Sequence, residues 1–310
     1  MAFAPDPVRA AAAARSQVMS GNILGVGAVL TWAMAFPAAE ILLQDWEPLA
    51  LIVARFALVT VVLVPLWAMI EGPRALISAR WGYGTLMGGL TFGLGAYLLL
   101  VAQSLTDAVT VAILAAMMPI AGAVIELIEG TRRLRITFVA GLGLSVIGGI
   151  VATGGGSVGA LGLGAMTVVV AVTLFAMGSH FSVRDLPDLT PLGRTAVTLA
   201  GCFGVTATLL LGSQFFGGAT LPTHNMDATQ WGLLAIYGLA GLALSQVLWI
   251  ASVGRLGVAV ASIHINLAPF YVMLLMLALG EDWNFQRALG AGIVIAGVVL
   301  AQKRKRPVVA

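Results

Sequence analysis

Apolar runs of about twenty residues, separated by short charged clusters, recur along the whole chain and constrain its fold more than any other feature. A run of that length lets an α-helix cross a hydrocarbon core about 30 Å thick. Residues 50–70 are apolar on every face, whereas strands of a membrane barrel alternate over about ten residues. The sequence therefore predicts an all-α membrane protein, in keeping with 60% hydrophobic and 9% charged residues.

Ten runs are predicted to span the membrane, with both termini in the cytoplasm. They cover residues 20–41, 48–70, 81–102, 108–128, 136–153, 159–181, 195–216, 229–252, 258–279 and 285–302. This topology places all of the 16 basic residues except Arg55 and Arg287 on the inner side, as the positive-inside rule requires. A single missed helix would scramble that segregation, so the charges support ten spans.

The second half of the chain repeats the first. Residues 105–124 align with 255–274, which sets Pro119 against Pro269. Because each half has an odd number of helices, the two copies must lie upside down relative to each other. The predicted organisation is a cytoplasmic N-terminal segment (1–19), a first five-helix repeat (20–153), a hinge loop (154–158), a second, inverted five-helix repeat (159–302) and a basic cytoplasmic tail (303–310).

Several motifs of this duplicated plan are typical of one family. Arg55-Phe56 stands early in the second span, and the proline-broken ninth span is followed by Gly280-Glu281 and a glycine-rich last span. With these features, residues 20–302 resemble the drug/metabolite transporter superfamily with its duplicated EamA-type unit. Within it, the chain is most similar to bacterial amino acid exporters, including the aromatic amino acid exporter. The first repeat departs from the pattern, because it carries Glu129-Gly130 in place of Gly-Glu.

The resemblance and the inverted repeat imply a secondary transporter in the bacterial cytoplasmic (inner) membrane. Its expected partners are the lipid bilayer and a small-molecule substrate, with export of neutral and aromatic amino acids as the main hypothesis. Export of amphipathic drugs or other metabolites is the alternative cargo, and a membrane receptor or assembly protein is the alternative class. The oligomeric state stays open, and a monomer is compatible with the sequence.

Other classes of function lack their sequence patterns. No nucleotide-binding loop, zinc-protease motif or catalytic triad is visible, so neither ATP hydrolysis, enzyme activity, catalytic residues nor a cofactor is predicted. The single Cys202 offers no thiolate metal site, and the scattered basic residues form no groove for nucleic acid. Because the spans hold few deep carboxylates, we expect transport that is not strongly driven by protons.

Polar and aromatic side chains near the middle of spans predict the substrate site. Trp32 lies near the middle of its span, whereas Trp46, Trp67, Trp81, Trp231, Trp249 and Trp283 fall in loops or near span ends, at the level of the lipid headgroups. A polar face inside a membrane helix should meet a partner or water rather than lipid. The predicted cavity-lining, substrate-binding residues are Trp32, Met117, Met118, Gln246, His264, Asn266 and Tyr271. Helix packing is the alternative for Trp32, and a hydrogen-bonded structural role is the alternative for His264.

Pro119 and Pro269 predict the moving parts. Each lacks an N–H and frees the carbonyl four residues back, at Ala115 and Ile265, so both helices should bend near midspan and act as hinges. Arg55 lies about two turns below the outer surface. We interpret it as a structural anchor that snorkels outward, with a transport role as the alternative.

Glycines within the spans are predicted to let helices approach closely, since no hydrophobic force acts between helices in lipid. The residues proposed for this role are Gly25, Gly88, Gly89, Gly93, Gly143, Gly148 and Gly292.

Overall fold

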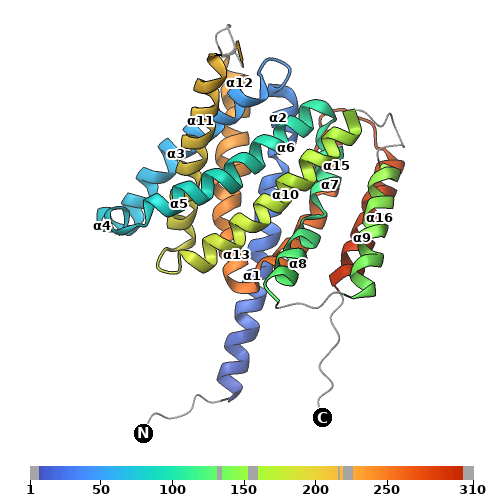
Figure 1. Cartoon of the computed structure of the whole chain (residues 1–310), viewed down its shortest axis with the longest axis horizontal. Coiled ribbons are helices and arrows are strands. Elements are labelled where there is room, and N and C mark those ends of the chain that lie inside the picture. Colours follow the sequence, from blue (N-terminus) through green and yellow to red (C-terminus); the bar gives the residue numbers. More distant parts are fainter. Residues whose placement is uncertain (1–6, 131–134, 153–159, 216, 219–225, 303–310) are drawn as a thin grey trace.

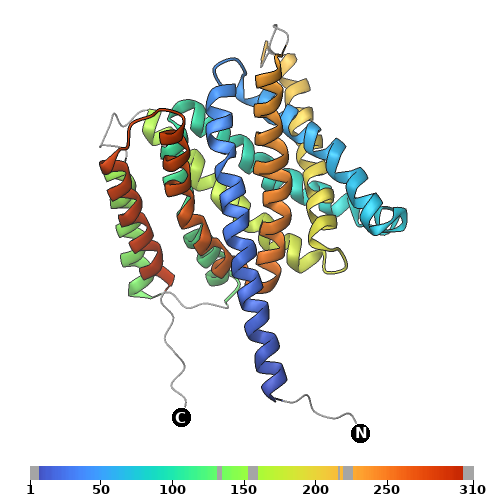
Figure 2. The ribbon, with the colours of Figure 1, turned by 180° about the vertical axis from the view of Figure 1, so that it is seen from behind.

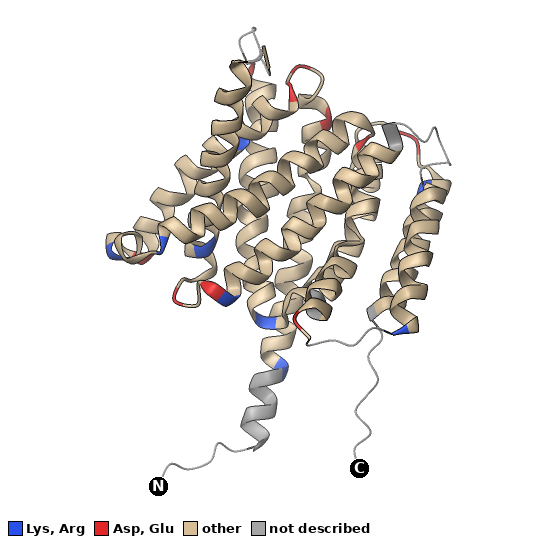
Figure 3. Cartoon of the chain, in the orientation of Figure 1, with Lys and Arg blue, Asp and Glu red and all other residues tan. Residues whose placement is uncertain are grey.

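The chain folds into a bundle of helices, shown by a computed structural model (Figure 1). The structure describes residues 7–130, 135–152, 160–215, 217–218 and 226–302, and no strand occurs among them. Seven helical segments are long and apolar enough to cross a membrane. Three shorter apolar helices accompany them: Ile136–Ala152, Ser262–Ala278 and Phe285–Ala301. Charged side chains gather at the two ends of the bundle and leave its middle almost free of charge (Figure 3). The predicted all-helical membrane architecture is thereby confirmed.

The described residues of the first half form ten helical elements. They are α1 (Pro7–Ala33), α2 (Ala35–Leu42), α3 (Pro48–Glu71), α4 (Pro73–Ser78), α5 (Trp81–Gly88), the π-helical η1 (Gly89–Gly93), α6 (Leu94–Leu105), α7 (Ala108–Ala115), α8 (Met118–Ile128) and α9 (Ile136–Ala152). Local chemistry sets several of their starts. Pro48 occupies the first turn of α3, where a missing N–H costs nothing. Asp107 caps α7 by accepting a hydrogen bond from the Thr110 N–H.

The second half forms nine described elements. They are α10 (Ala160–Asp185), α11 (Pro191–Gln214), α12 (Ala228–Ala235), the π-helical η2 (Ile236–Leu244), α13 (Ser245–Leu256), α14 (Val258–Ala261), the 3₁₀-helical η3 (Ser262–Leu267), α15 (Ala268–Ala278) and α16 (Phe285–Gln302). Helix α11 begins before the predicted residue 195, because Thr190 caps it and Pro191 starts it. The predicted hinge loop (154–158) and basic tail (303–310) lie outside the described residues.

Two constant offsets relate the halves. An offset of 143 residues pairs Pro48 with Pro191, and an offset of 150 residues pairs Pro119 with Pro269. Under the second offset, η1 falls within η2, so the two equivalent helices carry a π-helical segment at the same level. In Figure 1, α1 rises from the lower end of the bundle, whereas its counterpart α10 descends from the upper end. The two halves therefore run in opposite directions.

Helix packing follows the same relation. Helix α1 packs on α13, as the view from behind shows (Figure 2), and the equivalent pair from the other halves, α10 and α6, also packs together. Helices α9 and α16 are each other's counterparts and form a pair at one edge of the bundle. Exchanging the halves thus reproduces the arrangement, as a two-fold relation requires.

Glycines lie where two helices approach each other most closely. Two of the glycines that were predicted for this role do not lie at such a contact. A Cβ built on Gly148 would lie 2.6 Å from the backbone nitrogen of Val294, and one on Gly88 would lie 2.4 Å from the carbonyl oxygen of Thr198. Gly143 and Gly292 have no neighbouring atom within 4 Å, so the prediction is wrong for them. The reason for Gly143 is helix geometry, because residues two apart do not share a helix face and Gly141 takes the contact.

Candidate functional site in a central cavity

Two adjoining chambers lie inside the bundle, between the two halves. The first, here called the apolar chamber, is lined by Ala28, Val29, Trp32, Leu99, Ala115, Met118, Val172, Phe175, Ser245, Gln246, Trp249 and Ile265. The second, the arginine chamber, is lined by Trp32, Ala35, Phe36, Arg55, Ala96, Leu99, Leu100, Gln103, Phe175, Tyr237, Leu242, Ser245 and Gln246. Five residues belong to both walls, namely Trp32, Leu99, Phe175, Ser245 and Gln246, and we call the two adjoining chambers together the central cavity.

The wall of this central cavity follows the internal symmetry of the chain. Five pairs of lining residues are related by the two offsets: Val29 and Val172, Trp32 and Phe175, Ala96 and Gln246, Leu99 and Trp249, and Ala115 and Ile265. Equivalent helices of the two halves therefore present equivalent positions to the same space. The cavity lies on the pseudo-two-fold axis, where secondary transporters with inverted repeats bind their substrates.

Each chamber is small in this conformation, with a volume of about 40 Å³. Since a cavity of about 10–15 Å³ holds one water molecule, each chamber has room for about three. An aromatic side chain needs more space than that. Binding a substrate of this size would therefore require the helices around the cavity to separate.

Arg55 is the charged side chain of the arginine chamber, and only 6% of it is exposed. Its Nε donates to the carbonyl of Tyr237 at 2.9 Å, and its Nη2 donates to the carbonyl of Gly241 at 3.1 Å. The guanidinium also lies 3.8 Å from the centre of the Tyr237 ring. Both carbonyls belong to η2, whose wider turns disturb the helical hydrogen-bond ladder and let a side chain insert. The expectation that Arg55 snorkels outward is wrong, because these carbonyls hold it inside.

Aromatic rings form much of the apolar chamber. The Trp249 Nε1 donates to the Ser179 hydroxyl at 2.9 Å, which leaves the apolar part of the indole for the cavity wall. The Trp32 and Phe36 rings meet edge to face with their centres 4.8 Å apart. The prediction that Trp249 lies at the headgroup level is wrong, because this side chain is 6% exposed and lines the cavity.

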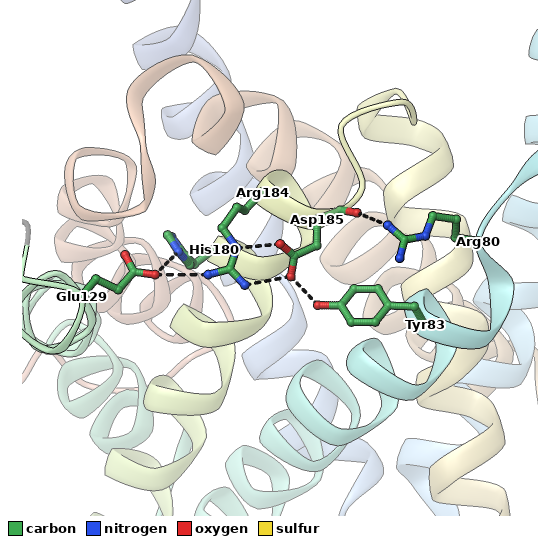
Figure 4. A network of polar contacts seen from close by, with 6 residues as sticks. All are labelled: Arg80, Tyr83, Glu129, His180, Arg184 and Asp185. Carbon is green, nitrogen blue, oxygen red and sulfur yellow. Dashed lines mark hydrogen bonds and ion pairs between the residues drawn. The ribbon is translucent and has the colours of Figure 1, made fainter.

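A network of polar contacts lies at the lower end of the bundle (Figure 4). Glu129, which follows α8, accepts from His180 at 2.8 Å and from Arg184 at 3.3 Å, both on α10. Asp185 accepts from Arg184 and from the hydroxyl of Tyr83 on α5. We call Arg80, Tyr83, Glu129, His180, Arg184 and Asp185 the Glu129 network. It joins three helices at the same end of the bundle.

Other polar contacts lie at the opposite, upper end. The Glu40 carboxylate, on α2, accepts from the Gln103 amide at 3.0 Å and from the Ala108 N–H at 2.9 Å. The guanidinium of Arg287 makes two bonds to the Asp107 carboxylate, at 3.0 and 3.2 Å. Polar contacts thus tie helices together at both ends of the bundle.

Two helices beside the cavity are broken at equivalent places. Helix α7 ends at Ala115 and α8 starts at Met118, directly before Pro119. In the other half, η3 interrupts the helix directly before Pro269. The carbonyl of Ile265 is not freed as expected, because it accepts the N–H of Ala268 in a tighter 3₁₀ turn. The helices are thus interrupted at both prolines, while their role as hinges stays a prediction.

Three of the predicted substrate-binding residues lie on the cavity wall, namely Trp32, Met118 and Gln246. Four do not: Met117, His264, Asn266 and Tyr271. The His264 ring packs on Gly25 of α1 and bonds the carbonyl of Ala261. Asn266 is buried, and its side-chain amide has no hydrogen-bond partner among the described residues. The two chambers thus include three of the seven residues, and the substrate-binding role of all seven stays a prediction.

Sequence reasoning missed Arg55, Trp249 and Phe175 as residues of the cavity wall. Arg55 carried a usable signal, because a charged residue inside a span is expensive and is commonly functional. The internal repeat would have found Phe175, since it stands at the position equivalent to Trp32.

A family model describing the EamA-like transporter family matches residues 19–154 and again residues 162–302. The chain belongs to this family. The two matched regions correspond to the two halves that the fold relates, one EamA unit in each. This EamA-like transporter is accordingly a multi-pass membrane protein and not an enzyme.

Individual relatives place the EamA-like transporter among proteins that are named as transporters. It is 26% identical to a "probable terminal-alkyne amino-acid exporter" of Streptantibioticus cattleyicolor over 287 residues, 89% of this chain and 91% of that protein. It is also 26% identical to the uncharacterized transporter YyaM of Bacillus subtilis over 118 residues, 38% of this chain and only 37% of that protein. One solved crystal structure shares the fold, with a TM-score of 0.68 at 18% identity over 92% of this chain and 97% of the other.

Proposed function

We propose that this chain exports small organic solutes, chiefly neutral and aromatic amino acids, by alternating access through the central cavity. The carrying observation is the central cavity, to whose wall the two inverted halves contribute five pairs of equivalent positions. Such a site can open toward one side when one half adopts the conformation of the other. Transport needs no ATP in this scheme, because a concentration difference of the substrate suffices.

The proposed topology has ten spans. Seven come from the long apolar segments and three from the shorter apolar helices. In this topology the lower end in Figure 1, where α1 starts and α16 ends, faces the cytoplasm of a bacterial inner membrane. One broken span consists of α14, η3 and α15, and another consists of α7 and α8.

The proposed cargo follows from the chemistry of the wall. Trp32, Phe175, Trp249 and Met118 provide apolar and polarisable surface for a side chain. Gln246 offers polar atoms for a main-chain group, and its Nε2 has no hydrogen-bond partner among the described residues. The relative from Streptantibioticus is named as an exporter of an amino acid, which supports the same class of cargo. Amphipathic drugs would use the aromatic wall but not the polar groups.

The proposed movement starts at the two helix breaks. If α8 swings about the break before Pro119, the Glu129 network separates and the cavity opens at the lower end. The equivalent movement of α15 about the break before Pro269 would open the upper end. Surface ion pairs of this kind contribute about 0–1 kcal/mol each, so thermal motion can break them.

Reconstitution in liposomes tests the proposal. Vesicles holding the purified chain are loaded with unlabelled tryptophan, and uptake of labelled tryptophan, alanine, a sugar and a cationic dye is then compared. We expect counterflow of the amino acids that protein-free vesicles lack. Counterflow of the dye without counterflow of any amino acid would replace the proposal by drug export.

A further inference from the structure

We infer that Arg55 binds the carboxylate of the substrate, so that the transporter selects molecules that combine a free carboxylate with an apolar or aromatic group. This inference rests on the proposed function, because it names the group that selects the substrate at the same cavity. It assigns to Arg55 a role in recognition beyond that of a structural anchor.

The first argument is charge. Arg55 is 6% exposed in a membrane-spanning helix, and no carboxylate of the described residues pairs with it. Backbone carbonyls are dipoles and compensate a buried guanidinium only in part. Charged side chains inside a membrane usually pair with an opposite charge or line a pathway. A carboxylate that enters the cavity would supply the missing charge.

The second argument is geometry. A guanidinium has five N–H donors, and the two printed bonds of Arg55 use only Nε and Nη2. Nη1 is not among the described side-chain nitrogens that are buried without a hydrogen-bond partner. Since Arg55 lines the arginine chamber, its remaining accessible surface faces that space. The contacts with η2 and Tyr237 hold the group in a fixed position, which lowers the cost of binding.

The third argument is the asymmetry between the halves. Under the offset of 143 residues, Arg55 is equivalent to Thr198, and its contact with Gly238 of η2 is equivalent to the contact of Thr198 with Gly88. The Thr198 hydroxyl bonds carbonyls within its own helix, and this residue does not line the cavity. The second half therefore makes the same helix joint without a guanidinium. Architecture alone does not require an arginine at this joint.

The fourth argument is the placement of the neighbouring groups. The arginine chamber adjoins the apolar chamber, and Trp32, Leu99, Phe175, Ser245 and Gln246 line both. A carboxylate at Arg55 would thus direct the apolar group of the same molecule toward Trp249 and Met118. Gln246 borders both chambers, and its Nε2 is buried without a hydrogen-bond partner among the described residues, so a polar group of the substrate that reached it would satisfy it. The cavity has the polarity of an amino acid: charged at one end and aromatic at the other.

Equilibrium binding to the purified full chain in detergent tests the inference. Labelled L-tryptophan is the probe, and L-tryptophanamide, which lacks the carboxylate but keeps the indole and the amine, is the competitor. Because a hydrogen-bonded charge pair is lost, we expect the amide to bind the native chain about tenfold to a hundredfold more weakly. Arg55→Gln should weaken tryptophan binding by a similar factor and should not weaken the binding of tryptophanamide. Arg55→Lys should retain part of the preference for tryptophan over tryptophanamide.

Arg194→Gln is the matched control. Arg194 also donates to two backbone carbonyls, those of Leu186 and Pro187, but it lies outside the cavity wall. This variant should keep the native preference for tryptophan over its amide. If Arg55 has only a structural role, Arg55→Gln should lower the thermal stability and weaken the binding of tryptophan and tryptophanamide equally. The ratio of the two affinities therefore separates a structural role from a role in recognition.

Three results would overturn the inference, each in a recognisable way. Equal binding of tryptophan and tryptophanamide by the native chain would do so without any variant, even if Arg55→Gln failed to fold. A folded Arg55→Gln variant that keeps the native preference would also overturn it, while leaving amino acid export intact. Binding of tryptamine but of no amino acid would overturn the proposed function together with the inference.

Discussion

Replacement of Gly201 by alanine should damage the joint between α11 and α5. A Cβ on Gly201 would lie 2.0 Å from the carbonyl oxygen of Thr85 and 2.5 Å from its Cα. Ordinary contacts begin at 3.4 Å, so the two backbones must move apart by about 1.4 Å. Neither helix can yield by rotating a side chain, because the atoms in the way are backbone atoms. Overpacking of this kind typically costs about 1–3 kcal/mol, and occasionally more.

Gly204→Ala on the same helix is the matched control, since Gly204 has no neighbouring atom within 4 Å. Thermal unfolding of both variants in the same detergent, followed by the loss of the monodisperse peak in size-exclusion chromatography, measures the difference. We expect a melting temperature several degrees lower for Gly201→Ala and a nearly native one for Gly204→Ala. Equal melting temperatures for the two variants would refute the argument that close backbone approach holds these helices together.

Three further outcomes are expected. Pro119→Ala and Pro269→Ala should each slow tryptophan counterflow while leaving equilibrium binding unchanged, and native rates in both would exclude them as hinges. Glu129→Gln removes the negative charge that pairs with His180 and Arg184 in the Glu129 network, so a Gln246→Cys reporter in a Cys202→Ser chain should react faster with a water-soluble thiol reagent; an unchanged rate would argue against a lower gate. An imposed pH gradient should drive no sustained uphill accumulation of tryptophan in liposomes, and accumulation that collapses with the gradient would show proton coupling.

Much of the fold followed from local signals in the sequence. The length and polarity of the apolar runs predicted the helices, and the prolines at matched positions marked where two of them break. The starts of α7 and α11 depend on caps that the sequence displays, Asp107 and Thr190. Glycine spacing was less informative, because a glycine at one position of a helix and a glycine two residues away point to different neighbours.

The central cavity could be predicted only in part, because its key interactions connect distant segments. The carbonyl that holds Arg55 belongs to Tyr237, 182 residues further along the chain. No local pattern announces the π-helical η2 that presents this carbonyl, since its sequence of glycines and aliphatic residues also suits a regular helix. The depth of Trp249 was predicted wrongly for a related reason. It depends on where α13 begins to cross the bundle, and the Trp249 Nε1 donates its hydrogen bond to Ser179 of another helix.

The residues that differ between the halves explain how a symmetric scaffold can hold an asymmetric molecule. Val29 and Val172, or Trp32 and Phe175, are similar in kind, so exchanging the conformations of the halves changes the apolar wall little. Arg55 and Thr198 are not similar, and neither are Ala96 and Gln246. If Arg55 binds the carboxylate as we propose, the polar end of the substrate has one place to bind in either conformation. Its apolar end could then stay in contact with aromatic rings while the two ends of the bundle open in turn.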